Sequence, residues 1–172
     1  MSSGQFSQQA DYLMVLRALH RLHELTLVGK DQGPEADAIR DGIDHPWNRL
    51  SETEKKRLEG LSEDLYSLSD PEVPAGTQKG IAEPDLRKYI EAHKSKDWDF
   101  ALALLRKMSN HLPPTLVAFL RGIIWQDAGD LETSAIFVRY VREVGRDHRE
   151  LVVDWLEAQI LNIVDSSRVT VP

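Results

Sequence analysis

The sequence predicts an all-α protein, and three observations support this fold class. Apolar residues recur at spacings of three and four along almost every segment, which is the period of an amphipathic helix. No convincing pair of segments alternates apolar and polar residues, as paired strands would. Glycine, proline and serine occur where helices of ordinary length would begin or end. The chain has 172 residues, 41% of them hydrophobic, which suffices for a buried core.

The first two predicted helices are delimited by glycine and proline. The first spans about residues 8–28 and ends at Gly29, a residue suited to the left-handed conformation of a helix C-cap. Pro34 suits the first turn of the second helix. Pro46 disfavours a helical conformation in the residue before it, so we expect this helix to end at about His45.

The third predicted helix opens with a capping box formed by Ser51 and Glu54. Leucines supply its apolar stripe, and Gly60 inside it costs about 1 kcal/mol relative to alanine. Residues 1–68 are therefore predicted to form an N-terminal block of three helices. Several glycines and prolines follow, and they predict a linker over residues 69–83.

The rest of the chain is also predicted to be helical. The expected helices cover residues 84–94, 98–109, 114–128, 131–145 and 149–164. The last of these carries the apolar stripe Val152, Trp155, Leu156, Ile160 and Ile163, which suits a capping helix. Residues 84–165 are predicted to form the C-terminal part of the fold, and residues 166–172 a tail.

A repeated pattern relates two segments of this C-terminal part. The stretches "KDWDFALALL" and "GDLETSAIFV" each open a helix after a tight turn, and Ala101 and Ala135 lie 34 residues apart. The pattern resembles the tetratricopeptide family, whose 34-residue repeat folds as two antiparallel helices. The resemblance covers about residues 84–147, although the loop at Gly129 is one residue longer than that of the family. It implies antiparallel helical hairpins, packed against the N-terminal block, with both alanines at helix–helix contacts.

This resemblance implies a function in recognition. It suggests a protein-interaction or scaffold module that binds a protein partner through a helical-repeat surface, without catalysis. In the family the first helix of each pair lines the concave surface, which here means residues 84–94 and 114–128. The resemblance makes these residues candidates for partner contact: Arg87, Tyr89, Lys94, Arg121 and Trp125. The N-terminal half also resembles uncharacterised bacterial proteins, and that resemblance implies no activity.

A second expectation concerns the burial of Trp125. It lies opposite Leu116 on a helix that is apolar on both sides, and such a helix is usually packed between two layers. We therefore expect the N-terminal block to bury Trp125 within the monomer and to offer its indole N–H an acceptor.

Composition limits the other classes of function. The formal net charge of -7 disfavours indiscriminate binding to nucleic acid or an anionic membrane. The absence of cysteine excludes zinc-thiolate centres, iron–sulfur clusters and a cysteine nucleophile. No stretch approaches the roughly 18 apolar residues of a membrane span, and no secretion signal opens the chain. We expect a cytoplasmic location, no cofactor, and neither nucleic acid nor membrane as a partner.

Two polar clusters support an alternative hypothesis, a metal-dependent or acid–base helical enzyme. Asp37, Asp41 and Asp44 share one face of the second predicted helix, and His20 and His23 stand three residues apart. An enzyme would need His20, His23, Asp41 and Asp44 to converge. The aspartates point away from the apolar stripe, so we expect a solvated acidic face, no metal site and no catalytic residue. A further alternative is a structural subunit that forms a homodimer.

Overall fold

The computed structural model describes residues 5–69, 83–112 and 114–144. These residues form seven α-helices and one short 3-10 helix and contain no strand, which confirms the all-α class for this part of the chain. The elements are α1 (Ala10–Leu27), α2 (Pro34–Asn48), α3 (Glu52–Ser69), α4 (Glu83–Lys94), α5 (Trp98–Met108), η1 (Ser109–His111), α6 (Pro114–Asp127) and α7 (Leu131–Val144). None of the helices in these ranges is long and apolar enough to span a membrane.

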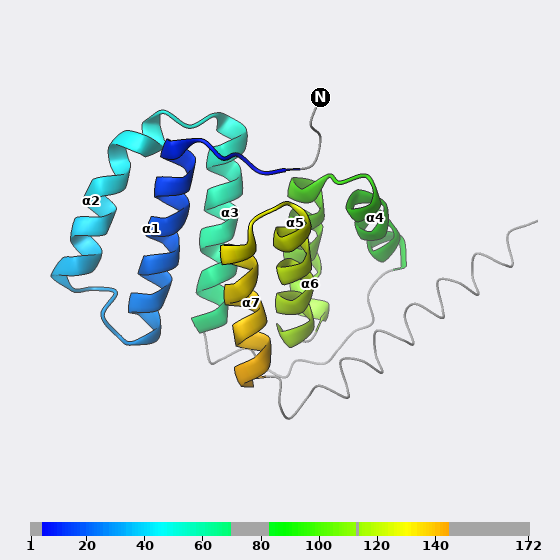
Figure 1. Ribbon diagram of the computed structural model, residues 1–172. Helices are drawn as coiled ribbons and strands as arrows, with labels where there is room; N and C mark the ends of the chain where they lie inside the picture. Colours follow the sequence, from blue (N-terminus) through cyan, green and yellow to red (C-terminus); the bar gives the residue numbers. More distant parts are fainter. Residues whose placement is uncertain (1–4, 70–82, 113, 145–172) are drawn as a thin grey trace, which may run out of the picture.

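The helices form one bundle with the N-terminal and C-terminal halves side by side. Figure 1 shows α2 at one edge, then α1 and α3, then α6 and α7 in front of α5, with α4 at the opposite edge. Helix α1 contacts both α2 and α3, while α4 packs on α5 and α6 packs on α7. Contacts of α3 with α5 join the two halves.

A single hydrophobic core runs through both halves of the bundle. Val15 from α1 and Leu61 from α3 are fully buried in the same cluster as Leu105 from α5 and Ile124 from α6. Each such side chain contributes roughly 1.5–3 kcal/mol by leaving water. The N-terminal block therefore supplies burial that the C-terminal helices lack by themselves.

Trp125 illustrates this shared core. Its side chain is completely buried, and its ring meets that of Phe6 edge to face at a centroid distance of 4.8 Å. The expectation that the N-terminal part of the chain buries Trp125 is confirmed. The expectation of an acceptor for its indole N–H is wrong for the described residues, because none of them accepts a hydrogen bond from that nitrogen. Its neighbour in the N-terminal segment is a phenyl ring, which offers no lone pair.

Two of the predicted helix ends have the expected hydrogen bonds. Gly29 adopts a φ of 70° after α1, and its N–H donates to the carbonyl of Thr26 at 3.1 Å. At the start of α3, the Ser51 N–H donates to a Glu54 carboxylate oxygen at 2.9 Å, and the Glu54 N–H donates to Ser51 Oγ at 3.2 Å. This is the reciprocal capping box that the sequence predicts.

The predicted end of the second helix is wrong. Helix α2 continues through Pro46 to Asn48 instead of ending at about His45. Pro46 lies in the last turn, where the missing N–H removes only one bond of the helix, and its ring is buried. Hydrogen bonds between residues three positions apart end the helix, since the Arg49 N–H donates to the Pro46 carbonyl at 3.1 Å.

The two turns within the C-terminal pairs share one hydrogen-bond pattern. Between α4 and α5, Lys96 has a φ of 60° and its N–H donates to the His93 carbonyl at 3.1 Å. Between α6 and α7, Gly129 has a φ of 90° and its N–H donates to the Gln126 carbonyl at 3.0 Å. Since 129 − 96 = 33, the equivalent turn residues are 33 positions apart.

This spacing moves the predicted alanine match by one residue. Ala101 is fully buried, but Ala135 is exposed, so the expectation of a helix–helix contact at Ala135 is wrong. At the 33-residue spacing Ala101 corresponds to Ser134, which is buried and donates its hydroxyl to the Gly122 carbonyl at 2.7 Å. The loop between α4 and α5 and the loop between α6 and α7 both have three residues, so Ala135 lies one position beyond the equivalent of Ala101.

Several sequence predictions lie outside the described residues. These are the linker from residue 70 to residue 82, the capping helix at 149–164 and the tail at 166–172. The division into domains therefore stays a prediction.

Candidate functional site

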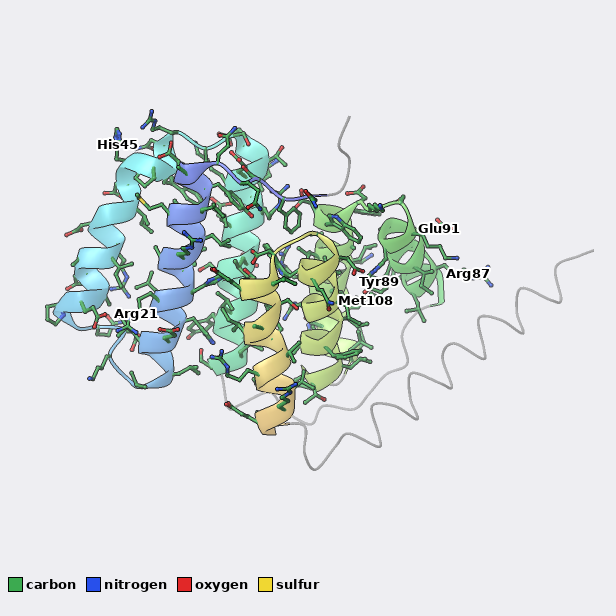
Figure 2. All side chains as sticks on the ribbon, viewed as in Figure 1. Arg21, His45, Arg87, Tyr89, Glu91 and Met108 are labelled. Atoms are coloured by element: carbon green, nitrogen blue, oxygen red, sulfur yellow. The ribbon has the colours of Figure 1, made fainter. Side chains whose placement is uncertain are left out.

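The predicted contact residues do not form one exposed surface. Arg87 and Lys94 are exposed on α4, and Figure 2 shows Arg87 pointing away from the bundle. Tyr89, Arg121 and Trp125 are buried, with exposed fractions of 6%, 5% and 0%. A partner therefore cannot reach these three side chains in this conformation. The sequence placed them on the correct helices but could not show which faces the neighbouring helices cover.

Arg121 belongs to an ionic network in the interior. Asp64 on α3 is 1% exposed, and its carboxylate lies 3.0 Å from Arg121 Nη2. Arg106 on α5 donates two further bonds to it, from Nε at 2.9 Å and from Nη2 at 3.1 Å. Burial raises the pKa of Asp64 above its usual range although both arginines act to lower it. The network fixes α3 to α5 and α6, which is a structural role.

Gly60 makes room for this network. A Cβ atom at Gly60 would lie 2.5 Å from Cζ and 2.7 Å from Nη1 of the Arg106 guanidinium. The glycine inside α3 is therefore needed for Arg106 to cross the helix and reach Asp64, and α3 continues without a break.

His20 is also part of an interior network. Its Nε2 lies 2.8 Å from Thr133 Oγ1, and that hydroxyl donates to Asp130 Oδ2 at 2.6 Å. Because the hydroxyl proton goes to the carboxylate, the imidazole must donate to the threonine through Nε2–H. Burial lowers the pKa of His20, against the opposing effect of Asp130. The chain of bonds joins α1 to the start of α7.

The four residues of the enzyme hypothesis do not converge. His20 and His23 are buried on α1, whereas Asp41 and Asp44 are exposed on α2. No group of three or more histidines, aspartates or glutamates within the described ranges could hold a metal ion. Asp37 instead forms an ion pair with Arg40 of the same helix, at 3.1 Å. The acidic face of α2 is thus exposed to solvent, and the described residues form no metal site there.

A third polar network has the order of groups found in hydrolytic triads. His93 Nε2 lies 2.9 Å from Asp127 Oδ2, and the Tyr89 hydroxyl lies 3.5 Å from His93 Nδ1. Tyr89 is buried, and burial raises its pKa, so the hydroxyl cannot serve as an activated nucleophile near neutral pH. The Trp98 ring also lies against the imidazole at a centroid distance of 5.2 Å. This network is a structural contact that joins α4 to α6.

Among the described residues, a hollow with features of a binding site lies between α1 and α3, and we name it the α1–α3 groove. It has a volume of about 100 Å³. Two helices line it, through Leu19, Leu22, His23 and Thr26 of α1 and Ser62, Leu65, Tyr66 and Ser69 of α3. On each helix the four positions follow the spacing i, i+3, i+4, i+7, so both present one face over two turns.

The walls of this groove are mainly apolar. Leucines from both helices form them, and the hydroxyls of Thr26 and Ser69 are bonded to carbonyls of their own helices at 2.9 Å and 2.8 Å. Tyr66 stands at the edge with 71% of its surface exposed. The groove therefore combines an apolar floor with a large aromatic side chain that has little cover.

His23 is the polar group within this apolar surface. It is only 8% exposed, and its imidazole forms no side-chain hydrogen bond with any other described residue. Burial lowers the pKa of His23, and the neighbouring His20 lowers it further. At neutral pH the groove thus presents a neutral imidazole that can donate or accept one more bond.

Separate parts of this groove could be predicted from the sequence, but the groove as a whole could not. The leucines of α1 and α3 follow helical periods, and His23 lies at the edge of the α1 stripe. What could not be predicted is that the C-terminal halves of α1 and α3 lie side by side, because no local pattern fixes the order of helices in a bundle.

A second hollow, of about 220 Å³, lies between α1 and the turn before α7. The chain's own N-terminal segment forms one of its walls, since Phe6 packs on Trp125 and the Arg57 guanidinium lies 3.9 Å above the Phe6 ring. The ion pair of Arg17 with Glu132, at 3.5 Å, joins its other two walls. The contacts that line this hollow therefore hold the N-terminal segment, α1 and the start of α7 together.

Comparison with known proteins found no matching family model, curated protein or solved structure. The functional assignment consequently depends on the geometry of the groove.

Proposed function

We propose that the protein is an interaction module that binds a protein partner through the α1–α3 groove. The observation that carries this proposal is the apolar hollow between Leu22 and Leu65, flanked by the exposed Tyr66 and containing the unpaired imidazole of His23. Residues that dominate binding energy in protein interfaces are often aromatic and lie beside pockets that exclude water. A hollow of this size accepts one aliphatic side chain, since apolar cavities of about 150 Å³ hold benzene.

Two exposed apolar residues follow the groove residues in the sequence. Leu27 and Val28 directly follow Thr26 of the groove and are 59% and 65% exposed. Soluble monomers rarely gather large exposed apolar side chains at one place without a function. Each 100 Å² of this surface that a partner covers contributes roughly 2.5 kcal/mol before the costs of association.

We infer that the pairs α4–α5 and α6–α7 are degenerate tetratricopeptide-like units that support this surface from the other side of the bundle. The equal length of the two loops supports this assignment, because three residues join the helices of each pair and the left-handed residues Lys96 and Gly129 lie 33 positions apart. A scaffold of this kind acts in the cytoplasm and needs no cofactor.

The test is affinity capture with three forms of the full chain. The proposal predicts that the wild type retains a stoichiometric partner and that Tyr66→Ser loses it. Phe119→Ser is the matched control, because Phe119 is an exposed aromatic residue on α6, outside the groove. Equal retention by Tyr66→Ser and Phe119→Ser would show that the groove is not the binding surface. A second copy of the chain as the captured protein would favour the homodimer alternative.

A further inference from the structure

The geometry of the α1–α3 groove fits one kind of secondary structure. Two helices contribute matching faces over two turns, so the groove is straight and about 10 Å long along the helix axis. A groove between two helix faces is the surface into which a third helix packs, with its own anchors at i, i+3, i+4 and i+7. Strand addition by an extended peptide would need unpaired backbone groups at a sheet edge, and the described residues contain no strand.

The electrostatics of the groove select the charge of that helix. The C-terminal halves of α1 and α3 line the groove together, so their negative dipole ends lie at the same end of it. Neither helix carries a basic residue in its last turn. Glu59 and Glu63 lie on the α3 face that continues into Ser62 and Tyr66, and neither forms an ion pair with another described residue. Lys56 is a further turn away from the groove.

Charge also distinguishes among the available occupants. The chain's own predicted helix at residues 149–164 has a suitable apolar stripe, but it carries one arginine against three carboxylates, Glu150, Asp154 and Glu157. Its net charge has the same sign as the groove, so it is a poor match. A helix with basic flanks complements the negative charge of Glu59, Glu63 and the two helix ends, and it covers the same apolar floor.

We propose that the partner segment is an amphipathic α-helix with basic flanks, bound in the α1–α3 groove. This inference rests on the proposed function and specifies its partner. The apolar face of the helix covers Leu22 and Leu65, and Tyr66 packs along its side. His23 supplies one hydrogen bond to a polar side chain on that face. The basic flanks lie over Glu59, Glu63 and the two helix ends.

The experiment uses synthetic peptides of about 18 residues, long enough to hold helical structure. One peptide has leucines at i, i+3, i+4 and i+7 with lysine flanks, and its counterpart has glutamate in place of each lysine. Binding to the full chain is followed through backbone amide shifts by nuclear magnetic resonance. We expect the lysine peptide to bind at least about tenfold more tightly, which is about 1.4 kcal/mol. The shifts should centre on Leu22, His23 and Tyr66.

Two charge variants make the result specific. Glu59→Lys with Glu63→Lys should abolish or reverse the preference for the lysine peptide. Asp41→Lys with Asp44→Lys changes the net charge by the same amount, at exposed positions of α2 away from the groove, and should leave the preference nearly unchanged.

Three outcomes would overturn the inference: equal affinity for the two peptides, shifts centred outside the groove, or equal effects of the two charge variants. None of them removes the proposed function, because a partner could still bind the groove through a segment of different chemistry. Loss of the proposed function would appear separately, as retention of the native partner by Tyr66→Ser.

Discussion

Substitution of Gly60 by alanine should destabilise the protein, although alanine is the better helix former. On propensity alone Gly60→Ala would gain about 1 kcal/mol. The new Cβ, however, would lie 2.5 Å from Arg106 Cζ, so the guanidinium must leave its position on Asp64. Breaking a buried ion pair on one side costs about 3–5 kcal/mol. Here the cost is smaller, because Arg106 is 25% exposed and Asp64 retains Arg121.

The net effect should be a loss of about 1–3 kcal/mol in the free energy of unfolding, measured by urea titration. Gly42→Ala is the matched control, since Gly42 lies inside α2 and a Cβ there would meet nothing within 4 Å. That variant should gain up to about 1 kcal/mol. In an Arg106→Ala background Gly60→Ala should stabilise as well. If Gly60→Ala is as stabilising as Gly42→Ala in the wild-type chain, the packing of Arg106 across α3 is wrong.

Three further substitutions test the interior. Burial lowers the pKa of His20 below the ordinary 6.5, so the free energy of unfolding should fall as the pH drops below 6.5. His20→Gln should flatten this pH dependence in urea titrations at several pH values. The dependence that remains is due to His23, whose pKa is also lowered by burial. Thr133→Val removes the hydroxyl that joins His20 to Asp130 and should cost about 1–3 kcal/mol, and a neutral result would show that the bonds contribute nothing. Ala101→Leu should overpack the core and lower the melting temperature by an amount equivalent to about 1–3 kcal/mol, while Ala135→Leu should be nearly neutral; similar losses in both would restore the 34-residue match.

Most of the helices could be predicted from the sequence because their signals are local. Gly29 and the pair Ser51–Glu54 act through hydrogen bonds within a few residues, and both form as expected. Pro46 misled the prediction because a proline is harmful mainly in a helix interior, and the last turn of α2 tolerates it. The repeat spacing was off by one because two alanines were matched by residue type, whereas the equally long loops before α5 and α7 make Ser134 the equivalent of Ala101.

The candidate site was predicted less well because it depends on packing between distant segments. Arg121 and Trp125 lie on α6 as expected, but only the arrangement of α3 and the N-terminal segment shows that their side chains are buried. The groove has the same origin, since His23 and Tyr66 are 43 positions apart and become neighbours only when α1 packs on α3. Periodicity identifies an apolar face but not the helix that covers it.

The most direct test of the proposed function is site-specific photo-crosslinking from position 66. A photoreactive phenylalanine analogue replaces Tyr66 in the full chain, and the same analogue at Phe119 on α6 serves as the control. We predict a discrete covalent adduct with one partner protein from position 66 only, with the crosslink mapped to a helical segment with basic flanks. Crosslinks from position 66 that join only segments of the same chain, or the same adduct from position 119, would contradict the assignment of the α1–α3 groove as the binding surface.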